Sequence, residues 1–204
     1  MTFDDIDELI AQAKAETLPE YLLDKQRKDS GLNPYLGFLR LLAMSPKLPA
    51  GPFLEIGVYH GTAPAHICEA SHRHGRHYYG VDLNYVQFAH PSFTLIQGDS
   101  TSDNVTSYLG STRTKNERTN NPEQGFACIF QDSSHHYLPT VIEWNLYHTM
   151  MKKGGVWISD DITPSFQLPE EPKGMVEYWD EIPAKNKRLY ENLHVGSTMG
   201  IVLF

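Results

Sequence analysis

The sequence contains few cysteines and no long apolar segment. Only Cys68 and Cys128 are present, each inside an apolar stretch, so we expect buried reduced thiols rather than a disulfide or metal ligands. No segment approaches the roughly 20 consecutive apolar residues of a membrane-spanning helix, and the first ten residues are acidic where a signal peptide would be basic. These absences predict a cytoplasmic protein without a membrane partner.

Basic side chains are also scarce, because 17 Lys and Arg residues face 25 Asp and Glu residues, for a net charge of -8. A polyanion would meet a repulsive field, so we expect no nucleic-acid partner. A chain of 204 residues with 40% hydrophobic content is long enough for one sizeable core. We predict a single domain, composed of an N-terminal helical extension at 1–50 and the main unit at 51–204.

The hydrophobic pattern of residues 1–50 is helical. Two apolar faces follow the helical period: Ile6, Leu9, Ile10 and Ala13 on one, and Leu36, Leu39 and Ala43 on the other. Asn33 and Pro34 form a start signal for the second helix. These helices are also a candidate surface for homo-oligomer formation.

Beyond residue 50, short apolar runs alternate with helical stretches, which is typical of a parallel sheet with helices on both faces. The predicted strands are 53–57, 78–82, 93–97, 126–130, 156–159, 188–194 and 199–204. A repeat of Leu138, Ile142, Leu146 and Met150 predicts a helix from about Pro139 to Met151 that ends at Gly154 and Gly155. The polar segment 111–125 is predicted to be a solvated loop. The fold class is therefore α/β, Rossmann-like, with a seven-stranded, mostly parallel sheet.

Glycines and acids follow the first three predicted strands. Glu55, Gly57, Tyr59, Gly61 and Thr62 lie where the first strand turns into a helix, and glycine lets the backbone approach a ligand closely there. The turn lacks the third glycine of G-x-G-x-x-G, which disfavours NAD.

The next two strands end in acidic residues. Asp82, followed by Leu83, ends the second strand, where a carboxylate can accept the hydroxyls of a ribose. Asp99 and Ser100 follow the third strand and could reach an adenine amino group. The alternative is that these residues are ordinary turns and helix caps.

Three aspartates follow the fourth and fifth predicted strands: Asp132, Asp160 and Asp161. Carboxylates brought together at one sheet edge repel one another, and their pKa values rise unless a cation neutralises them. Oxygen ligands without cysteine favour Mg²⁺, with Mn²⁺ or Ca²⁺ as alternatives. In the structural alternative, Asp160 or Asp161 caps a turn and Asp132 bonds a backbone amide.

Taken together, the acid-G-x-x-x-G turn and the two strand-end acids resemble the S-adenosylmethionine site of class I methyltransferases. The segments FQDSSHHY and GGVWISDDI resemble the metal-binding pattern of the macrocin-type sugar O-methyltransferases and their cephalosporin-hydroxylase-related relatives. The resemblance covers about residues 50–180. It implies that S-adenosylmethionine is the cofactor, that Asp132, Asp160 and Asp161 hold a divalent ion, and that His135 is the catalytic base. His136 is the competing candidate for the base.

The sequence therefore predicts a divalent-metal-dependent O-methyltransferase that acts on a small-molecule hydroxyl, such as that of a sugar, a vicinal diol or a catechol. Asp132 is also a candidate cofactor contact, and Tyr59, His60 and Trp179 are candidates for the pocket wall, with core packing as the alternative for Trp179. Three rival functions remain at this point: a metal-independent methyltransferase, a non-catalytic module that binds S-adenosylmethionine or a nucleotide, and a dehydrogenase, which the missing glycine disfavours.

Overall fold

The structure, a computed structural model, describes residues 1–16, 34–115, 125–164, 172–193 and 198–204, without the side chains of 112–115. Its centre is a seven-stranded sheet in the order β3-β2-β1-β4-β5-β7-β6. The strands are β1 Phe53–Ile56, β2 Tyr78–Asp82, β3 Phe93–Gln97, β4 Phe126–Gln131, β5 Met151–Ser159, β6 Lys187–Glu191 and β7 Thr198–Leu203. β1 to β5 are mutually parallel, whereas β7 is antiparallel to β5 and β6. The predicted sheet is confirmed.

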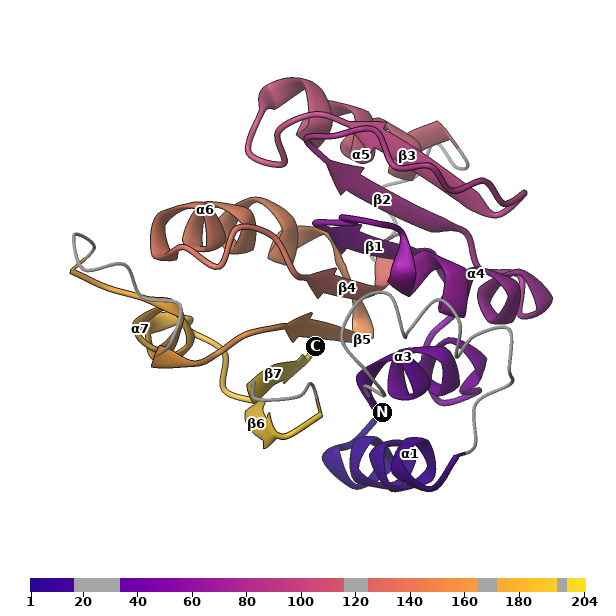
Figure 1. Ribbon diagram of the computed structural model, residues 1–204, viewed down its shortest axis with the longest axis vertical. Helices are drawn as coiled ribbons and strands as arrows, with labels where there is room; N and C mark the ends of the chain where they lie inside the picture. The colour runs from indigo at the N-terminus through magenta and orange to yellow at the C-terminus, as the bar shows by residue number, and fades with distance from the viewer. Residues whose placement is uncertain (17–33, 116–124, 165–171, 194–197) are drawn as a thin grey trace.

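Helices cover both faces of this sheet (Figure 1). One face carries α1 Phe3–Ala15, α3 Pro34–Met44 and α4 Thr62–Arg73, and the other carries α5 Asp103–Lys115, α6 Tyr137–Tyr147 and α7 Met175–Glu181. Alternate residues of β1 serve the two layers: Phe53 packs with the first group of helices, and Leu54 and Ile56 pack with the second. This alternation follows from the two-residue period of a strand.

The N-terminal helices share a core with the sheet. The predicted face of α1 is buried at Ile6, Ile10 and Ala13, and α3 begins at Pro34 as expected. A capping box between Thr2 and Asp5 starts α1. Residues 17–33 lie outside the described residues, and the oligomer surface on these helices stays a prediction.

The predicted boundary between α6 and β5 is wrong by several residues. α6 ends at Tyr147, a 3₁₀ turn spans His148–Met150, and β5 already begins at Met151, so Gly154 and Gly155 lie inside the strand. The cause is an irregularity in the ladder, because its register shifts between Phe126 and Cys128 and Gly154 has φ +78° there. Glycine adopts this conformation without strain, as in many β-bulges.

Three further sequence predictions fall on these elements. Residues 111–115 belong to α5, so the prediction of a loop is wrong for them. The last turn of this helix is polar and therefore shows no apolar period in the sequence. Residues 116–124 lie outside the described residues. Cys68 and Cys128 are buried and free, as expected. None of the helices in the described ranges is long and apolar enough to cross a membrane.

Candidate active site

A cavity of about 810 Å³ opens at the carboxyl ends of β1 to β4. Most of the predicted site residues line it: Glu55, Gly57, Tyr59, His60, Thr62, Asp82, Leu83, Asp99, Ser100, Asp132, His135 and Asp161. Gly61, His136, Asp160 and Trp179 are not among the lining residues. Trp179 is instead buried in the core, where one edge of its ring lies against Gly200, so the packing alternative is confirmed for it.

The turn between β1 and α4 passes close to the end of β4. Gly57 has φ +91°, and a Cβ added to it would lie 2.0 Å from the carbonyl oxygen of Asp132, so only glycine fits. Gly61, also at positive φ, is the N-cap of α4. Tyr59 adopts φ +51° and is 74% exposed at the mouth of the cavity. The predicted need for glycine at this turn therefore has a physical cause.

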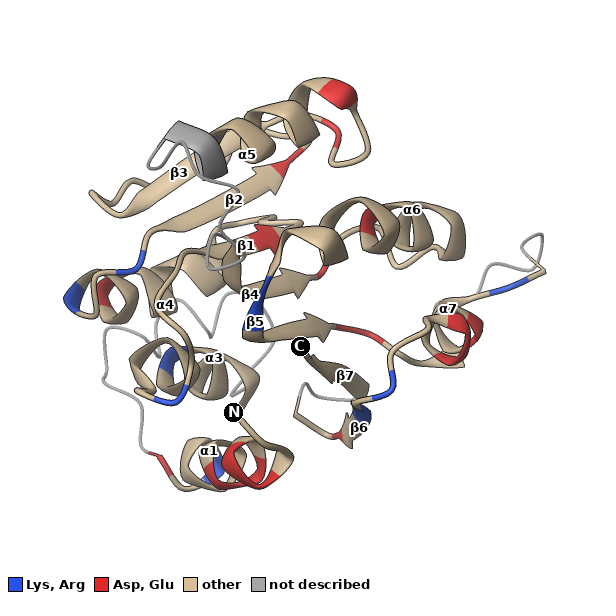
Figure 2. Ribbon diagram, turned by 180° about the vertical axis from the view of Figure 1, so that it is seen from behind, with Lys and Arg blue, Asp and Glu red and all other residues tan. Residues whose placement is uncertain are grey.

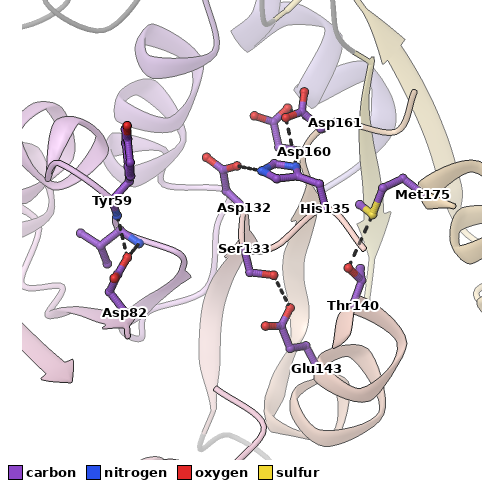
Figure 3. Close-up of polar contacts among 11 residues, drawn as sticks. Tyr59, Asp82, Asp132, Ser133, His135, Thr140, Glu143, Asp160, Asp161 and Met175 are labelled. Carbon is purple, nitrogen blue, oxygen red and sulfur yellow. Dashed lines mark hydrogen bonds and ion pairs between the residues drawn. The ribbon is translucent and has the colours of Figure 1, made fainter. Parts of the chain in front are cut away.

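Asp82 organises the same turn. Its Oδ2 accepts hydrogen bonds from the backbone amides of Val58, at 3.0 Å, and Tyr59, at 2.8 Å (Figure 3). Its Oδ1 accepts from the amide of Asn84 at 2.8 Å. The carboxylate thus ties the end of β2 to the loop after β1, and its contact with a ribose stays a prediction.

Two residues that follow β3 make different contacts: Asp99 bonds within its own turn, and Ser100 bonds a buried acid of α6. Asp99 accepts hydrogen bonds from the amide and the hydroxyl of Thr101, which lower the pKa of Asp99. Ser100 donates its hydroxyl to Glu143 of α6 at 2.5 Å. Burial raises the pKa of Glu143, although hydrogen bonds from Ser100, Gln131 and Ser133 oppose that rise.

Sequence reasoning missed Glu143 and the contribution of α3. The four-residue repeat predicts an apolar face of the helix at Leu138 and Ile142 and gives no role to Glu143. In the structure, those two side chains are exposed and line the cavity, while the buried face of α6 carries Thr140, Glu143, Trp144 and Tyr147. A lone acid between Ile142 and Trp144 was the available signal. Tyr35 and Leu36 of α3 also line the cavity, and nothing in their local sequence indicated it.

Acidic residues follow the neighbouring strands β4 and β5, and Figure 2 shows those after β5. The ligand atoms of Asp132, His135 and Asp161 all lie within 4.8 Å of one another. His135 places Nδ1 3.0 Å from Asp161 Oδ2 and Nε2 3.6 Å from Asp132 Oδ1 (Figure 3). His135 and Asp161 both have φ +55°, a strained conformation for residues other than glycine.

Asp160 is fully buried, and its Oδ1 accepts a hydrogen bond from the amide of Asp161 at 2.9 Å. Desolvation raises the pKa of Asp132 well above its usual range, and the negative charges of Asp160, Glu55 and Asp161 raise it further. Carboxylate oxygens at this spacing, combined with a local excess of negative charge, fit a hard divalent cation. The participation of each aspartate as a ligand stays a prediction.

The two histidines differ in position. His135 contacts Asp132 and Asp161, whereas His136 is the N-cap residue of α6 and its carbonyl accepts hydrogen bonds from the amide and the hydroxyl of Thr140. Of these two histidines, His135 lines the cavity and His136 does not. The geometry therefore favours His135 for a role at the cavity.

The cavity has one sign of formal charge. Six acids line it, namely Glu55, Asp82, Asp99, Asp132, Glu143 and Asp161, and no Lys or Arg is found among the lining residues in the described ranges. Burial raises the pKa of Glu55 to about 8, and the negative charge of Asp82 adds to the rise, although the hydrogen bond from the Tyr78 hydroxyl opposes it. The cavity is suited to cationic ligands.

Solved methyltransferases share this fold. The SAH-bound methyltransferase PaMTH1 of Podospora anserina superposes with a TM-score of 0.64 at 13% identity, over 98% of this chain and 96% of that one. The SAM-bound O-methyltransferase TomG of Streptomyces achromogenes gives 0.59 at 13% identity, over 92% and 91%. MycE of the mycinamycin biosynthetic pathway, in complex with Mg and SAH, gives 0.58 at 16% identity, over 91% of this chain.

The chain spans about half the length of MycE, 43% to 55% in three structures of it. No curated protein matches the sequence. A family model described as a methyltransferase domain matches residues 54–162, from β1 to the residue that follows Asp161. Because this match takes in more than half of the 204 residues, the chain belongs to that family of methyltransferase domains, and its fold is that of a class I methyltransferase.

Proposed function

We propose that the protein is an S-adenosylmethionine-dependent O-methyltransferase that requires a divalent cation and methylates a hydroxyl group of a small molecule. The observation that carries this proposal is the cavity, where acids alone supply the formal charge of the described wall and where Asp132, His135 and Asp161 converge. A sulfonium cofactor and a divalent ion are both cations, so the wall complements them. The relatives TomG and MycE are consistent with it, since one is an O-methyltransferase and the other binds Mg.

In this proposal, Asp132, Asp160 and Asp161 supply the oxygen ligands of the ion, which is Mg²⁺ with Mn²⁺ or Ca²⁺ as substitutes. A divalent ion at this position would act as a Lewis acid that lowers the pKa of the acceptor hydroxyl. Glu55, Gly57, Tyr59, Thr62, Asp82, Leu83, Asp99 and Ser100 line the part of the cavity assigned to the cofactor.

His135 is the proposed base. Its Nδ1 lies 3.0 Å from Asp161, which orients the ring and leaves Nε2 on the side of Asp132. A neutral imidazole can act as a general base, so Nε2 takes up the proton that the acceptor hydroxyl loses as its oxygen takes the methyl group from the sulfonium sulfur, which leaves as the thioether of S-adenosylhomocysteine. Asp161 then stabilises the resulting imidazolium through the same contact.

The preferred acceptor is a vicinal diol, as in a sugar or a catechol, because two adjacent oxygens can chelate one ion and so align the reacting hydroxyl. Leu138, Pro139 and Ile142 of α6 give the cavity an apolar wall beside His135, which suits the carbon skeleton of such a molecule. A nucleic-acid substrate is disfavoured by the net charge of -8 and by the acidic wall.

The proposal is tested by assaying methyl transfer from S-adenosylmethionine to a panel of catechols, sugars and monohydroxy compounds, with and without EDTA. We expect transfer to diols, loss of activity with EDTA and recovery on addition of Mg²⁺. Activity that survives chelation would favour a metal-independent methyltransferase. Cofactor binding without transfer to any acceptor would favour a non-catalytic binding module.

A further inference from the structure

A buried hydrogen-bond network lies at the ends of β4 and β5, next to the aspartates of the site. Gln131 is the last residue of β4, Ser159 is the last residue of β5, and the two are paired in the register of the sheet. Gln131 immediately precedes Asp132, and Ser159 immediately precedes Asp160. A displacement of either residue therefore reaches a carboxylate through a single peptide unit.

The side-chain amide of Gln131 is fully used by this network. Its Nε2 donates to the carbonyl of Thr140 at 3.0 Å and to Glu143 Oε2 at 2.9 Å. Its Oε1 accepts from the hydroxyl of Tyr178 at 2.8 Å and from that of Ser159 at 2.9 Å. A primary amide has two donors and two acceptor lone pairs, so this one is completely satisfied and its orientation is fixed.

The carboxylate of Glu143 contacts both chain neighbours of Asp132. Glu143 Oε2 accepts from Gln131, which precedes Asp132, and from the hydroxyl of Ser133, which follows it, at 2.7 Å (Figure 3). On the neighbouring strand, the hydroxyl of Ser159 accepts from the indole of Trp157 at 2.8 Å. Both strand ends are thus fixed by buried polar contacts, which are stiff because each broken contact would leave an unsatisfied group.

We propose that Gln131, Ser159 and Tyr178, which we call the Gln131 network, are positioning residues that hold Asp132 and the Asp160–Asp161 pair at the spacing that a divalent cation requires. This inference rests on the metal site of the proposed function. None of the three residues lines the cavity, and all are buried, so they act on a bound ion only through the aspartates. Residues that orient metal ligands typically change metal affinity 10- to 100-fold when they are replaced.

The test uses the substitution Tyr178→Phe in the full chain, which removes one hydroxyl and keeps the aromatic ring. Mn²⁺ affinity is measured by electron paramagnetic resonance in the presence of S-adenosylhomocysteine, whose own affinity is measured by calorimetry. We expect Mn²⁺ to bind about ten-fold more weakly, with an unchanged affinity for S-adenosylhomocysteine.

Tyr147→Phe is the matched control. Tyr147 is equally buried, and its hydroxyl donates one hydrogen bond, to the carbonyl of Ser100 at 2.5 Å, and none to the three residues of the Gln131 network. We expect this variant to bind Mn²⁺ as the unsubstituted protein does. An equal loss in both variants would reflect general loosening and would overturn the inference.

Ser159→Ala is the second variant, and it stands in for Tyr178→Phe if that protein does not fold, as judged by thermal melting. It is expected to weaken Mn²⁺ binding to a similar extent. A folded variant of either kind with unchanged Mn²⁺ affinity overturns the role of the network and leaves the proposed function intact. If the unsubstituted protein itself fails to bind Mn²⁺, the metal-dependent function and this inference both fail.

Discussion

The cavity has one end at β2 and β3 and another at β4 and β5, and the carboxylates at these two ends have different surroundings. At the ends of β2 and β3, Asp82 and Asp99 accept hydrogen bonds from backbone amides, which belong to their own loops and, for Asp82, also to the loop after β1. At the ends of β4 and β5, Asp132, Asp160 and Asp161 lie near one another, and burial, together with the negative charges of Asp160, Glu55 and Asp161, raises the pKa of Asp132. The first end is completed by the chain itself, whereas in the proposed function a divalent cation neutralises the second.

The largest effect is expected from Asp161→Asn, which removes a negative charge at the end of the cavity formed by β4 and β5. We expect methyl transfer to fall at least about 100-fold and Mn²⁺ affinity to fall with it, because the variant loses a proposed metal ligand and the anionic partner of His135. Steady-state kinetics and Mn²⁺ titration measure both quantities. In Asp99→Asn, at the other end, Mn²⁺ affinity should be unchanged. Equal losses of Mn²⁺ affinity in both variants would contradict the division of the cavity into two ends.

Gly57→Ala tests the close approach between the loop after β1 and the loop after β4. Its Cβ would lie 2.0 Å from the carbonyl oxygen of Asp132, and φ there is +91°, so backbone would have to move. We expect the free energy of unfolding to fall by about 3 kcal/mol or more, measured by denaturant titration. Gly110→Ala in α5 is the control, because its Cβ would meet nothing within 4 Å, and it should raise stability by about 0.5 to 1 kcal/mol. Equal stability of both variants would show that the loops after β1 and β4 do not approach this closely.

Asp82→Ala should have a smaller effect, confined to the end of the cavity at β2 and β3. Three backbone amides, those of Val58, Tyr59 and Asn84, would lose their acceptor. We expect a loss of about 1 to 3 kcal/mol in stability and roughly ten-fold weaker binding of S-adenosylhomocysteine, with Mn²⁺ affinity unchanged. Asp82→Asn keeps one acceptor oxygen and should lose less stability. If the two variants behave alike, the charge of Asp82 matters more than its hydrogen bonds.

The sequence predicted most of the fold, because the signals for strands are local. β2 and β3 match their predicted bounds, and the acids at strand ends could be placed at one edge before any coordinates, because parallel strands end on the same side of a sheet. The end of α6 and the start of β5 could not be predicted, because the glycines at 154 and 155 suit a helix stop as well as a bulge, and only the pairing with β4 distinguishes them.

The candidate site was predicted only in part for a similar reason. Asp82, Asp99 and Asp132 stand next to recognisable strand ends, whereas Glu143 takes its role from contacts with Ser100 and Ser133, which are 43 and 10 residues away in the sequence. Such long-range contacts leave no periodic or local pattern. They must be seen in three dimensions.

For Glu55→Gln, the expected effect is a change in the slope of stability against pH. The folded pKa of Glu55 is about 8 against a usual value of 4.5, so between these pH values the folded state keeps a proton that the unfolded state has lost. Stability of the ligand-free protein should therefore fall as pH rises through this window, by at most about 1.4 kcal/mol per pH unit from this group. Glutamine cannot titrate, so chemical denaturation from pH 5 to 9 should show a shallower decline in Glu55→Gln, with some slope remaining from Asp132 and Glu143, whose pKa values are also raised. If stability declined equally with pH in the unsubstituted protein and in Glu55→Gln, Glu55 would already be ionised in the folded state. The wall of the cavity would then carry one more negative charge than the burial of the Glu55 carboxyl implies.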